Sequence, residues 1–329
     1  MAAPFDVVGI GNAIVDVLAH STDAFLARHS LPKGGMTLID AHQAQRLYAE
    51  MGPGVECSGG SAANTMAGLA SLGSRAAYIG KVHDDELGRV FRHDLTAAGV
   101  YFATPPMRKG PTTARCLILV TPDAQRTMQT YLGACTQLGP EDIDADLIAQ
   151  SKVTYLEGYL FDPPAAKEAF TKAATLAHKA GRKVALSLSD GFCVNRHRAE
   201  FLDLVKNHVD ILFANENEIG ALYQTVEFDD ALQAMRGHCE IAALTRSEKG
   251  SVVLAGDEVH IIDAEADVAV IDTTGAGDLY AAGFLHGLAT GRSLADCARL
   301  GGICAAEVIG HVGARPGRPL DRLIAEKMG

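Results

Sequence analysis

The chain has 329 residues, of which 48% are hydrophobic and 21% charged, and its formal net charge at pH 7 is −11. This composition is typical of a globular protein that buries a large core. Because the charge is acidic and Lys and Arg form no block, we expect neither a nucleic acid nor a membrane surface as partner.

The cysteines and the N-terminus indicate the compartment. The seven cysteines are scattered, odd in number and contain no CxxC pair, which is typical of reduced thiols and not of disulfides or a zinc site. The N-terminus lacks the basic stretch of a signal peptide, and no uncharged apolar run approaches the roughly 18 residues of a spanning helix. We therefore expect a cytoplasmic protein.

Short apolar runs alternate with longer segments of helical spacing along most of the chain. Near-continuous apolar strands that alternate with helices predict an α/β fold with a mostly parallel central sheet covered by helices on both faces. The predicted strands are 5–10, 76–79, 153–156, 184–188, 211–213 and 241–244, and the predicted helices are 61–71, 85–98, 164–180 and 196–207.

Two segments, 17–40 and 101–131, depart from this alternation. Within the second, residues 113–120 and 126–131 alternate apolar and polar side chains on either side of a turn, as half-exposed antiparallel strands do. We expect these segments to form a small, discontinuous β-sheet lid. The large domain then comprises 1–16, 41–100 and 132–329.

The glycine-rich motif near the N-terminus does not indicate a dinucleotide site. Gly9-Ile10-Gly11 begins like the dinucleotide fingerprint, but Ile14 stands at its third glycine, and no helix with a suitably placed acidic residue follows. A Walker A sequence is also absent. Any phosphate is therefore expected to bind in another way.

Gly59-Gly60-Ser61 precedes a predicted helix. By themselves these residues favour a turn with an N-cap. However, Asn64 lies in the first turn beside the glycines, where the backbone can approach a ligand closely.

The stretch DTTGAGD (272–278) joins an apolar run, predicted as a strand, to a helix of small residues. Thr273 or Thr274 is expected to cap this helix, while Gly275 and Gly277 leave its first turn open. Free N–H groups and the helix dipole there make an anion site. Because Asp278 would repel a merely stored anion, we expect it to meet a hydroxyl that attacks a phosphate.

These motifs resemble a known family. DTTGAGDLYAAGF resembles the C-terminal signature of the ribokinase, or PfkB-type, carbohydrate kinases, and GGSAANTMAGLASLG (59–73) resembles their N-terminal signature. NENE (215–218) matches the family's N-x-x-E motif. LTRSEKG (244–250) is similar to the T-x-G-x-x-G nucleotide segment, with Ser247 in place of its first glycine. The resemblance implies a ribokinase-like fold and ATP-dependent phosphoryl transfer.

Within the family the likeness is to adenosine kinases. The lid segment LPKGGMTLID lacks the P-x-x-G-E-T sequence of sugar-specific ribokinases, and residues 111–134 resemble the second lid portion of a bacterial adenosine kinase. This implies phosphorylation of the 5′-hydroxyl of adenosine, giving AMP and ADP. A sugar kinase acting on ribose or fructose and a non-catalytic nucleotide sensor are the alternatives. We expect a monomer, with pairing of lid edge strands in a dimer as the alternative.

The resemblance also implies which residues bind the nucleoside. Asp16, Gly60 and Asn64 would hold the ribose hydroxyls, with Asn12 in support and Ser61 near the purine. Phe161, or Tyr159 in its place, would stack on the base.

Other residues would serve the reaction. Asp278 would accept the proton of the 5′-hydroxyl, and the backbone N–H groups of Gly275, Ala276 and Gly277 would stabilise charge on the γ-phosphoryl group. Arg126 would close over that group when the lid closes.

The same resemblance implies a nucleotide and metal site. Glu218, together with Asn215, would order Mg²⁺ through water, and Asp272 near 310–313 would hold a monovalent cation such as K⁺. The residues expected to contact ATP are Asn215, Thr245, Ser247 and Gly250.

Overall fold

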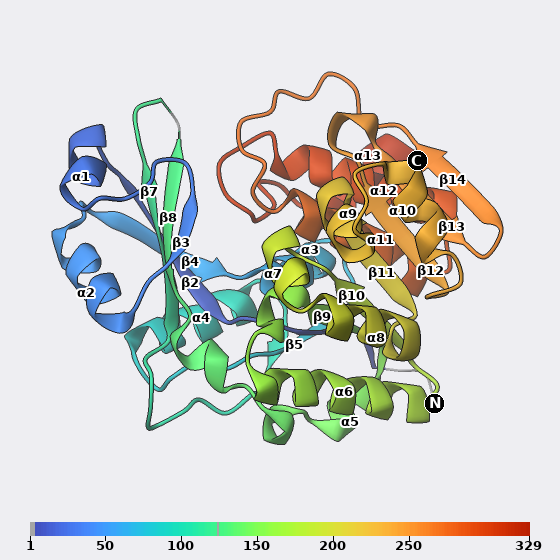
Figure 1. Ribbon diagram of the computed structural model, residues 1–329, viewed down its shortest axis with the longest axis horizontal. Helices are drawn as coiled ribbons and strands as arrows, with labels where there is room; N and C mark the ends of the chain where they lie inside the picture. Colours follow the sequence, from blue (N-terminus) through green and yellow to red (C-terminus); the bar gives the residue numbers. More distant parts are fainter. Residues whose placement is uncertain (1–3, 124) are drawn as a thin grey trace.

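The computed structural model describes residues 4–123 and 125–329, and within these ranges the strands form one sheet of nine and one of five (Figure 1). The expected large domain's first three residues and lid residue 124 lie outside the described residues. No helix in the described ranges is both long and apolar enough to cross a membrane.

The nine-stranded sheet has the order β14-β13-β12-β11-β10-β9-β1-β5-β6, and only β12–β13 and β13–β14 pair antiparallel. Because the other strands are parallel, their carboxyl ends meet along one edge, where α/β proteins bind ligands. The strands are β1 (Phe5–Ile10), β5 (Ala76–Ile79), β6 (Tyr101–Phe102), β9 (Ser151–Glu157), β10 (Lys183–Ser187), β11 (Ile211–Asn215), β12 (Ile241–Thr245), β13 (Ser251–Ala255) and β14 (Glu258–Ile262).

Helices cover both faces of this sheet, and each face has its own apolar cluster. The four predicted helices are confirmed within two residues at each end. One cluster includes residues of α3 (Ser61–Ser71), α4 (Glu86–Ala97), α11 (Ala276–Ala289), α12 (Leu294–Val308) and α13 (Leu320–Met328). The other includes residues of α5 (Ala145–Ala149), α6 (Pro164–Lys179), α7 (Gly191–Arg196), α8 (Arg198–His208), α9 (Glu216–Tyr223) and α10 (Phe228–Met235). Short 3₁₀ turns lie at η1 (Gly133–Gln137), η2 (Pro140–Asp142), η3 (Gly158–Phe161) and η4 (Ser247–Lys249).

The five-stranded sheet stands beside the large body, with α1 (Asp23–Arg28) and α2 (Ala41–Glu50) on its outer side (Figure 1). Its order is β3-β8-β7-β2-β4. The pairs β2–β4 and β7–β8 are antiparallel, whereas β2–β7 and β3–β8 are parallel. The strands are β2 (Ile14–His20), β3 (Met36–Leu38), β4 (Gly54–Gly59), β7 (Ala114–Val120) and β8 (Arg126–Tyr131).

The observed strands differ from four expectations. β4 lies in segment 41–100 but pairs with β2 in the small sheet, and β2 itself begins at Ile14. β6, expected in the lid, pairs with β5 of the large sheet. The run 268–271 is not a strand: Val270 and Ile271 are 61% and 59% exposed. The apolar pattern did not predict β4 because its sequence, GVECSG, has few apolar residues. It predicted a strand at 268–271 that does not form, because no strand of the described ranges lies beside this run to pair with it.

Candidate active site

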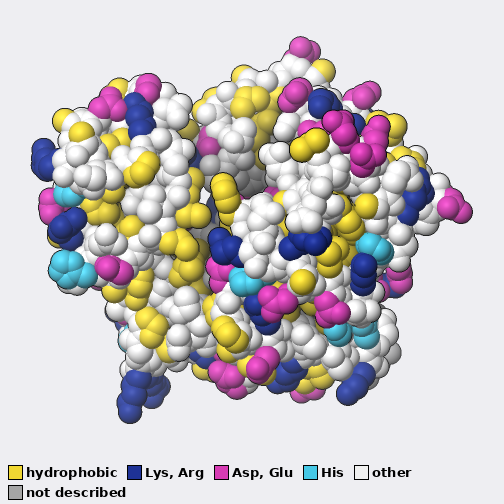
Figure 2. All heavy atoms as spheres, in the orientation of Figure 1, with side chains coloured by type: hydrophobic (Ala, Val, Ile, Leu, Met, Phe, Trp, Pro, Cys, Tyr) yellow, Lys and Arg dark blue, Asp and Glu magenta, His cyan; other side chains and the backbone are white. Residues whose placement is uncertain are grey.

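A cleft of about 800 Å³ lies where the carboxyl edge of the large sheet faces the small sheet. Figure 2 shows the surface hollowed between the two bodies. Its walls come from strand ends, from the first turns of α3 and α11, and from apolar side chains of the small sheet. Strand ends and helix N-termini converge here because the parallel strands all point to this edge.

The first turn of α11 forms one wall. The helix begins after Gly275, which has a left-handed φ of 83°, and a Cβ on it would lie 2.8 Å from the Cα of Ala314. Glycine is therefore required there by both conformation and space. A Cβ on Gly277 would meet nothing within 4 Å, so this side of the turn is open. The N–H groups of the turn can thus approach an anion closely.

The expected threonine cap was wrong. The N-cap is Gly275, which has no side chain to offer. Thr274 instead donates from Oγ1 to Oδ1 of Asp272 at 2.7 Å. The threonine therefore orders the loop that precedes the helix and leaves the helix N–H groups without a side-chain cap.

Asp278 is held from α3 across the cleft. Its Oδ1 accepts a hydrogen bond from Ser61 Oγ at 2.6 Å, and its Oδ2 accepts one from Asn64 Nδ2 at 2.9 Å. Burial raises the pKa of Asp278, while these two hydrogen bonds and the charge of Arg315 lower it. Ser61, expected near the purine, is thus engaged with this carboxylate. The structure brings together the two glycine-rich signatures through these contacts.

Asp16 faces the cleft from β2. No side-chain or backbone donor in residues 4–123 and 125–329 bonds its carboxylate, and a Cβ on Gly59 would overlap it. Burial raises the pKa of Asp16 to about 7. Nearby, the side-chain oxygen of Asn64 is buried and also lacks a partner. The cleft therefore presents two acceptors without donors.

Glu157 is a site residue that sequence reasoning missed. It ends β9, is 1% exposed, and accepts hydrogen bonds from Asn12 Nδ2 and Ala62 N, both at 2.8 Å. Burial raises the pKa of Glu157 to about 7. Asn12 therefore supports the site through this carboxylate, which joins the end of β1 to the start of α3. The signal available in the sequence was the position of Glu157 as a charged residue at the end of an apolar strand.

Arg126 reaches from β8 to the loop before α11. Its Nη2 lies 2.8 Å from Oδ2 of Asp272, and its Nη1 donates to Thr274 Oγ1 at 3.0 Å. Asp272 also accepts from Thr274 N and from Gly313 N at 2.8 Å. The small sheet is thus tied to the loop before α11. Asp272 therefore has Arg126 as its counter-ion here, and its expected role toward a monovalent cation stays a prediction.

The expected nucleotide residues lie at the ends of β11 and β12. Asn215 and Glu218 bond each other reciprocally at the start of α9: Asn215 Nδ2 donates to Glu218 Oε1 at 2.7 Å, and Glu218 N donates to Asn215 Oδ1 at 2.9 Å. Burial raises the pKa of Glu218 to about 7, and its side chain lines the cleft with Thr245.

Ser247 and Gly250 form the turn after β12 and do not line the cleft. Ser247, which replaces the glycine of the family pattern, has a left-handed φ of 51°. Only a small set of L-residues adopts this conformation without strain. Ser247 therefore has the left-handed backbone conformation that the glycine of the family pattern would adopt easily at this position.

One carboxylate fits a hydrated magnesium ion. The described ranges contain no group of three or more His, Cys, Asp or Glu side chains that could hold a metal ion directly. Glu218 is a buried carboxylate that faces the cleft and accepts hydrogen bonds from Asn215, which suits contact with Mg²⁺ through water because this ion keeps several waters and binds substrate phosphates.

Phe161 was the wrong aromatic. It is 4% exposed and packs in the core against Phe201, at a ring-centroid distance of 4.4 Å. Tyr159 and Phe192 line the cleft instead, at 40% and 78% exposure. Residues 158–161 form a 3₁₀ turn, in which side chains two positions apart point in different directions. When Phe161 enters the core, Tyr159 therefore remains outside it.

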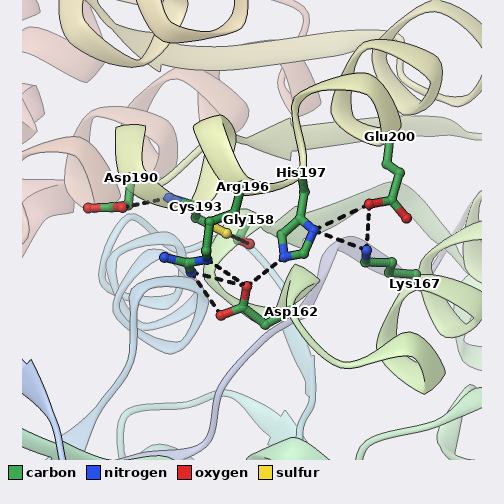
Figure 3. Close-up of polar contacts among 8 residues, drawn as sticks. All are labelled: Gly158, Asp162, Lys167, Asp190, Cys193, Arg196, His197 and Glu200. Atoms are coloured by element: carbon green, nitrogen blue, oxygen red, sulfur yellow. Dashed lines mark hydrogen bonds and ion pairs between the residues drawn. The ribbon is translucent and has the colours of Figure 1, made fainter.

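A polar network holds the wall that carries these aromatics (Figure 3). Arg196 Nη2 donates to Asp162 Oδ2 at 2.9 Å, and His197 Nε2 lies 2.7 Å from Asp162 Oδ1. Cys193 Sγ contacts the carbonyl oxygen of Gly158 at 3.4 Å. These contacts join the turn after β9 to α7 and α8, so the two aromatic segments form one wall.

Comparisons with known proteins agree with this geometry. Residues 30–321 match the pfkB family carbohydrate kinases. The chain is 55% identical to an adenosine kinase from Sinorhizobium meliloti of known crystal structure, over 99% of this chain and 100% of that chain, with a TM-score of 0.92. It is 51% identical to a probable sugar kinase from Rhizobium etli, over 99% of each chain, also with a TM-score of 0.92.

An ATP-dependent ribose-1-phosphate kinase from Halopiger xanaduensis is 31% identical over 278 residues, which are 82% of this chain and 86% of that protein. The predicted α/β fold with a second small sheet is confirmed.

Proposed function

Since this chain belongs to the PfkB family of carbohydrate kinases, we propose that it is an adenosine kinase, which transfers the γ-phosphoryl group of ATP to the 5′-hydroxyl of adenosine and releases AMP and ADP. Family membership confirms the resemblance that the sequence motifs indicated. It also makes the protein a phosphotransferase with a hydroxyl acceptor. The choice of adenosine as that acceptor is the proposal.

The observation that carries the proposal is the pair of acceptors without donors in the cleft. The side-chain oxygen of Asn64 is buried without a partner, and the half-buried carboxylate of Asp16 accepts no hydrogen bond within the described ranges. A buried acceptor left unsatisfied costs about 1–3 kcal/mol, and more when it is charged. A ligand with vicinal hydroxyl groups, as in ribose, would satisfy both.

The apolar part of the cleft supports a nucleoside over a free sugar. The small sheet presents Met36, Leu38 and Met128, and the opposite wall presents Tyr159 and Phe192. A flat base suits such walls because aromatic rings stack and thioethers pack well against them. Ribose or fructose alone would leave this apolar surface uncovered.

The catalytic end of the cleft supports phosphoryl transfer through positioning and charge. The transition state of this reaction is loose, so the enzyme mainly aligns the groups and stabilises charge. Asp278, fixed by Ser61 and Asn64, would orient the 5′-hydroxyl and accept its proton as the new bond forms. The N–H groups at the start of α11 would stabilise the charge on the transferred group.

Two further groups would serve the nucleotide. Glu218, supported by Asn215, would hold Mg²⁺ through water, and the ion would neutralise phosphate charge. Arg126 would add positive charge beside the transferred group if it exchanged Asp272 for phosphate when ATP binds.

The test is ATP consumption by the purified protein with adenosine, inosine, ribose, ribose 1-phosphate and fructose measured side by side. We expect kcat/KM to be highest for adenosine, and the Asp278→Asn variant serves as the background control. Faster turnover of a free or phosphorylated sugar would contradict adenosine as the acceptor and identify a sugar kinase. Two similar proteins, a probable sugar kinase and a ribose-1-phosphate kinase, suggest this alternative. ATP binding without turnover of any acceptor would favour the sensor alternative.

A further inference from the structure

Arg315 is a buried cation that the reaction described above does not use. It follows Ala314, which packs on Gly275. Its Nη1 donates to Ala63 O at 2.8 Å, and its Nη2 donates to Ser58 O at 2.9 Å and to Ser58 Oγ at 2.8 Å. All these acceptors are uncharged. Within residues 4–123 and 125–329, no carboxylate forms a direct ion pair with this guanidinium.

The segments that Arg315 bonds are those that frame the two acids of the cleft. Ser58 precedes Gly59, against which the Asp16 carboxylate lies. Ala63 precedes Asn64, whose amide holds Asp278. The guanidinium therefore lies between a strand end beside one acid and a helix turn beside the other.

Asp94 of α4 partly balances this charge from behind. Its Oδ2 accepts hydrogen bonds from Ser58 N at 2.7 Å and from Ser58 Oγ at 2.6 Å. Asp94 is thus one hydroxyl group away from Arg315. The other titratable groups that interact electrostatically with Asp16, Asp278 or Arg315 are Cys57 of β4, Tyr78 of β5, Cys116 of β7, Arg126 of β8, Tyr155 and Glu157 of β9, Tyr159 of η3 and Glu218 of α9.

We propose that Arg315 is a positioning residue of the phosphoryl transfer, whose fixed charge favours the ionised forms of Asp16 and Asp278 inside the cleft. Its hydrogen bonds also hold Ser58 and Ala63 in place. The inference rests on the proposed function, because it assigns these two acids to acceptor binding and proton transfer.

Electrostatics support the assignment. Burial raises the pKa of Asp16 and of Asp278, and the positive charge of Arg315 opposes this rise in both. A protonated Asp16 would lose its charge and present an O–H donor in place of one acceptor, and a protonated Asp278 could not take the hydroxyl proton. Because guanidinium stays protonated at any working pH, Arg315 supplies a charge that does not titrate with them.

The test compares Arg315→Lys, which keeps the charge, with Arg315→Gln, which keeps a hydrogen-bond donor but not the charge. The measurement is kcat/KM against pH, with the acceptor that the wild-type protein uses fastest. We expect the acid limb of Arg315→Gln to move to higher pH by about one unit, the lower end of the effect of a nearby charge, and Arg315→Lys to keep the wild-type limb. An unchanged limb, with activity reduced equally at every pH in both variants, would show a structural tether only and overturn the proposal.

Asp94→Asn tests the same idea in the opposite direction and leaves Arg315 intact. Removing this negative charge should make the net field at Asp16 and Asp278, to which Arg315 contributes, more positive, so the acid limb should move to lower pH. This result is expected even if the Arg315 variants fail to fold, and a limb that stays or moves upward would overturn the proposal. The two proposals can fail independently. If the wild-type protein prefers a sugar, adenosine is not its acceptor, but the shifts of the acid limb measured with that sugar still test the role of Arg315.

Discussion

Replacing Asp278 by Asn separates the role of its charge from the role of its shape. Ser61 Oγ and Asn64 Nδ2 now donate to the two carboxylate oxygens at 2.6 and 2.9 Å. An asparagine can keep both contacts: its oxygen accepts from Asn64, and its NH₂ group donates to the Ser61 hydroxyl, which can also accept. The substitution therefore removes the proton acceptor while the local hydrogen bonds persist.

The size of the effect follows from this geometry. Loss of a positioned general base lowers turnover by about 10²–10⁴-fold, which is about 3–5 kcal/mol of transition-state stabilisation. The free energy of unfolding should change by no more than about 1 kcal/mol, because one hydrogen bond has about that net value. Since burial raises the pKa of Asp278, removing the charge also removes a cost of folding.

Steady-state kinetics, adenosine binding by calorimetry and thermal unfolding of the same preparation test this prediction. Ser61→Ala is the matched control, because it removes one hydrogen bond but keeps the carboxylate, and we expect about a tenfold loss of kcat, the lower end of the net value of a hydrogen bond to a charged group. The reasoning fails if Asp278→Asn retains near-normal turnover, or if adenosine affinity falls as much as kcat does.

The remaining predictions concern binding, the lid and the loop before α11. Asp16→Ala should weaken adenosine binding by about 2–3 kcal/mol, the value of hydrogen bonds to a charged group, without changing ATP affinity; equal adenosine affinity in calorimetry would place the ribose elsewhere. Since the pKa of Asp16 is raised to about 7, wild-type adenosine affinity should fall as the pH falls through that region and this acceptor is protonated, and a flat pH profile would contradict it. Arg126→Ala should lower kcat more than adenosine affinity, and hydrogen exchange in residues 113–131 should slow when adenosine closes the lid over the cleft; identical exchange with and without adenosine would argue against closure. Gly275→Ala should lower the free energy of unfolding by more than about 1–2 kcal/mol, because the left-handed φ of 83° alone costs an L-residue that much, and an unchanged melting temperature would disprove the need for glycine.

Several features of this protein followed from the sequence because their causes are local. The apolar runs of the parallel strands and the helices between them depend on hydrophobic periodicity, which neighbouring residues establish. The glycine-rich turns at 59–60 and 275–277 depend on backbone conformations that few residues other than glycine adopt, and Gly60 and Gly275 indeed have positive φ values. The family resemblance placed Ser61, Asn64 and Asp278 in one site, whereas the direct bonds of Ser61 and Asn64 to Asp278 emerged only in the structure.

Other features depended on contacts between residues far apart in the chain. The sequence could not distinguish Tyr159 from Phe161 as the aromatic side chain that faces the cleft. Phe161 packs against Phe201 in the core, and Tyr159 therefore lines the cleft. The sequence of β4 has little strand character. It forms a strand because it pairs with the edge of β2 in the small sheet. Glu157 and Arg315 reach partners on other elements, Ala62 and Ser58 among them. Burial and hydrogen-bond partners of this kind arise only when distant segments meet, because they are properties of the packed chain and not of any short stretch of it.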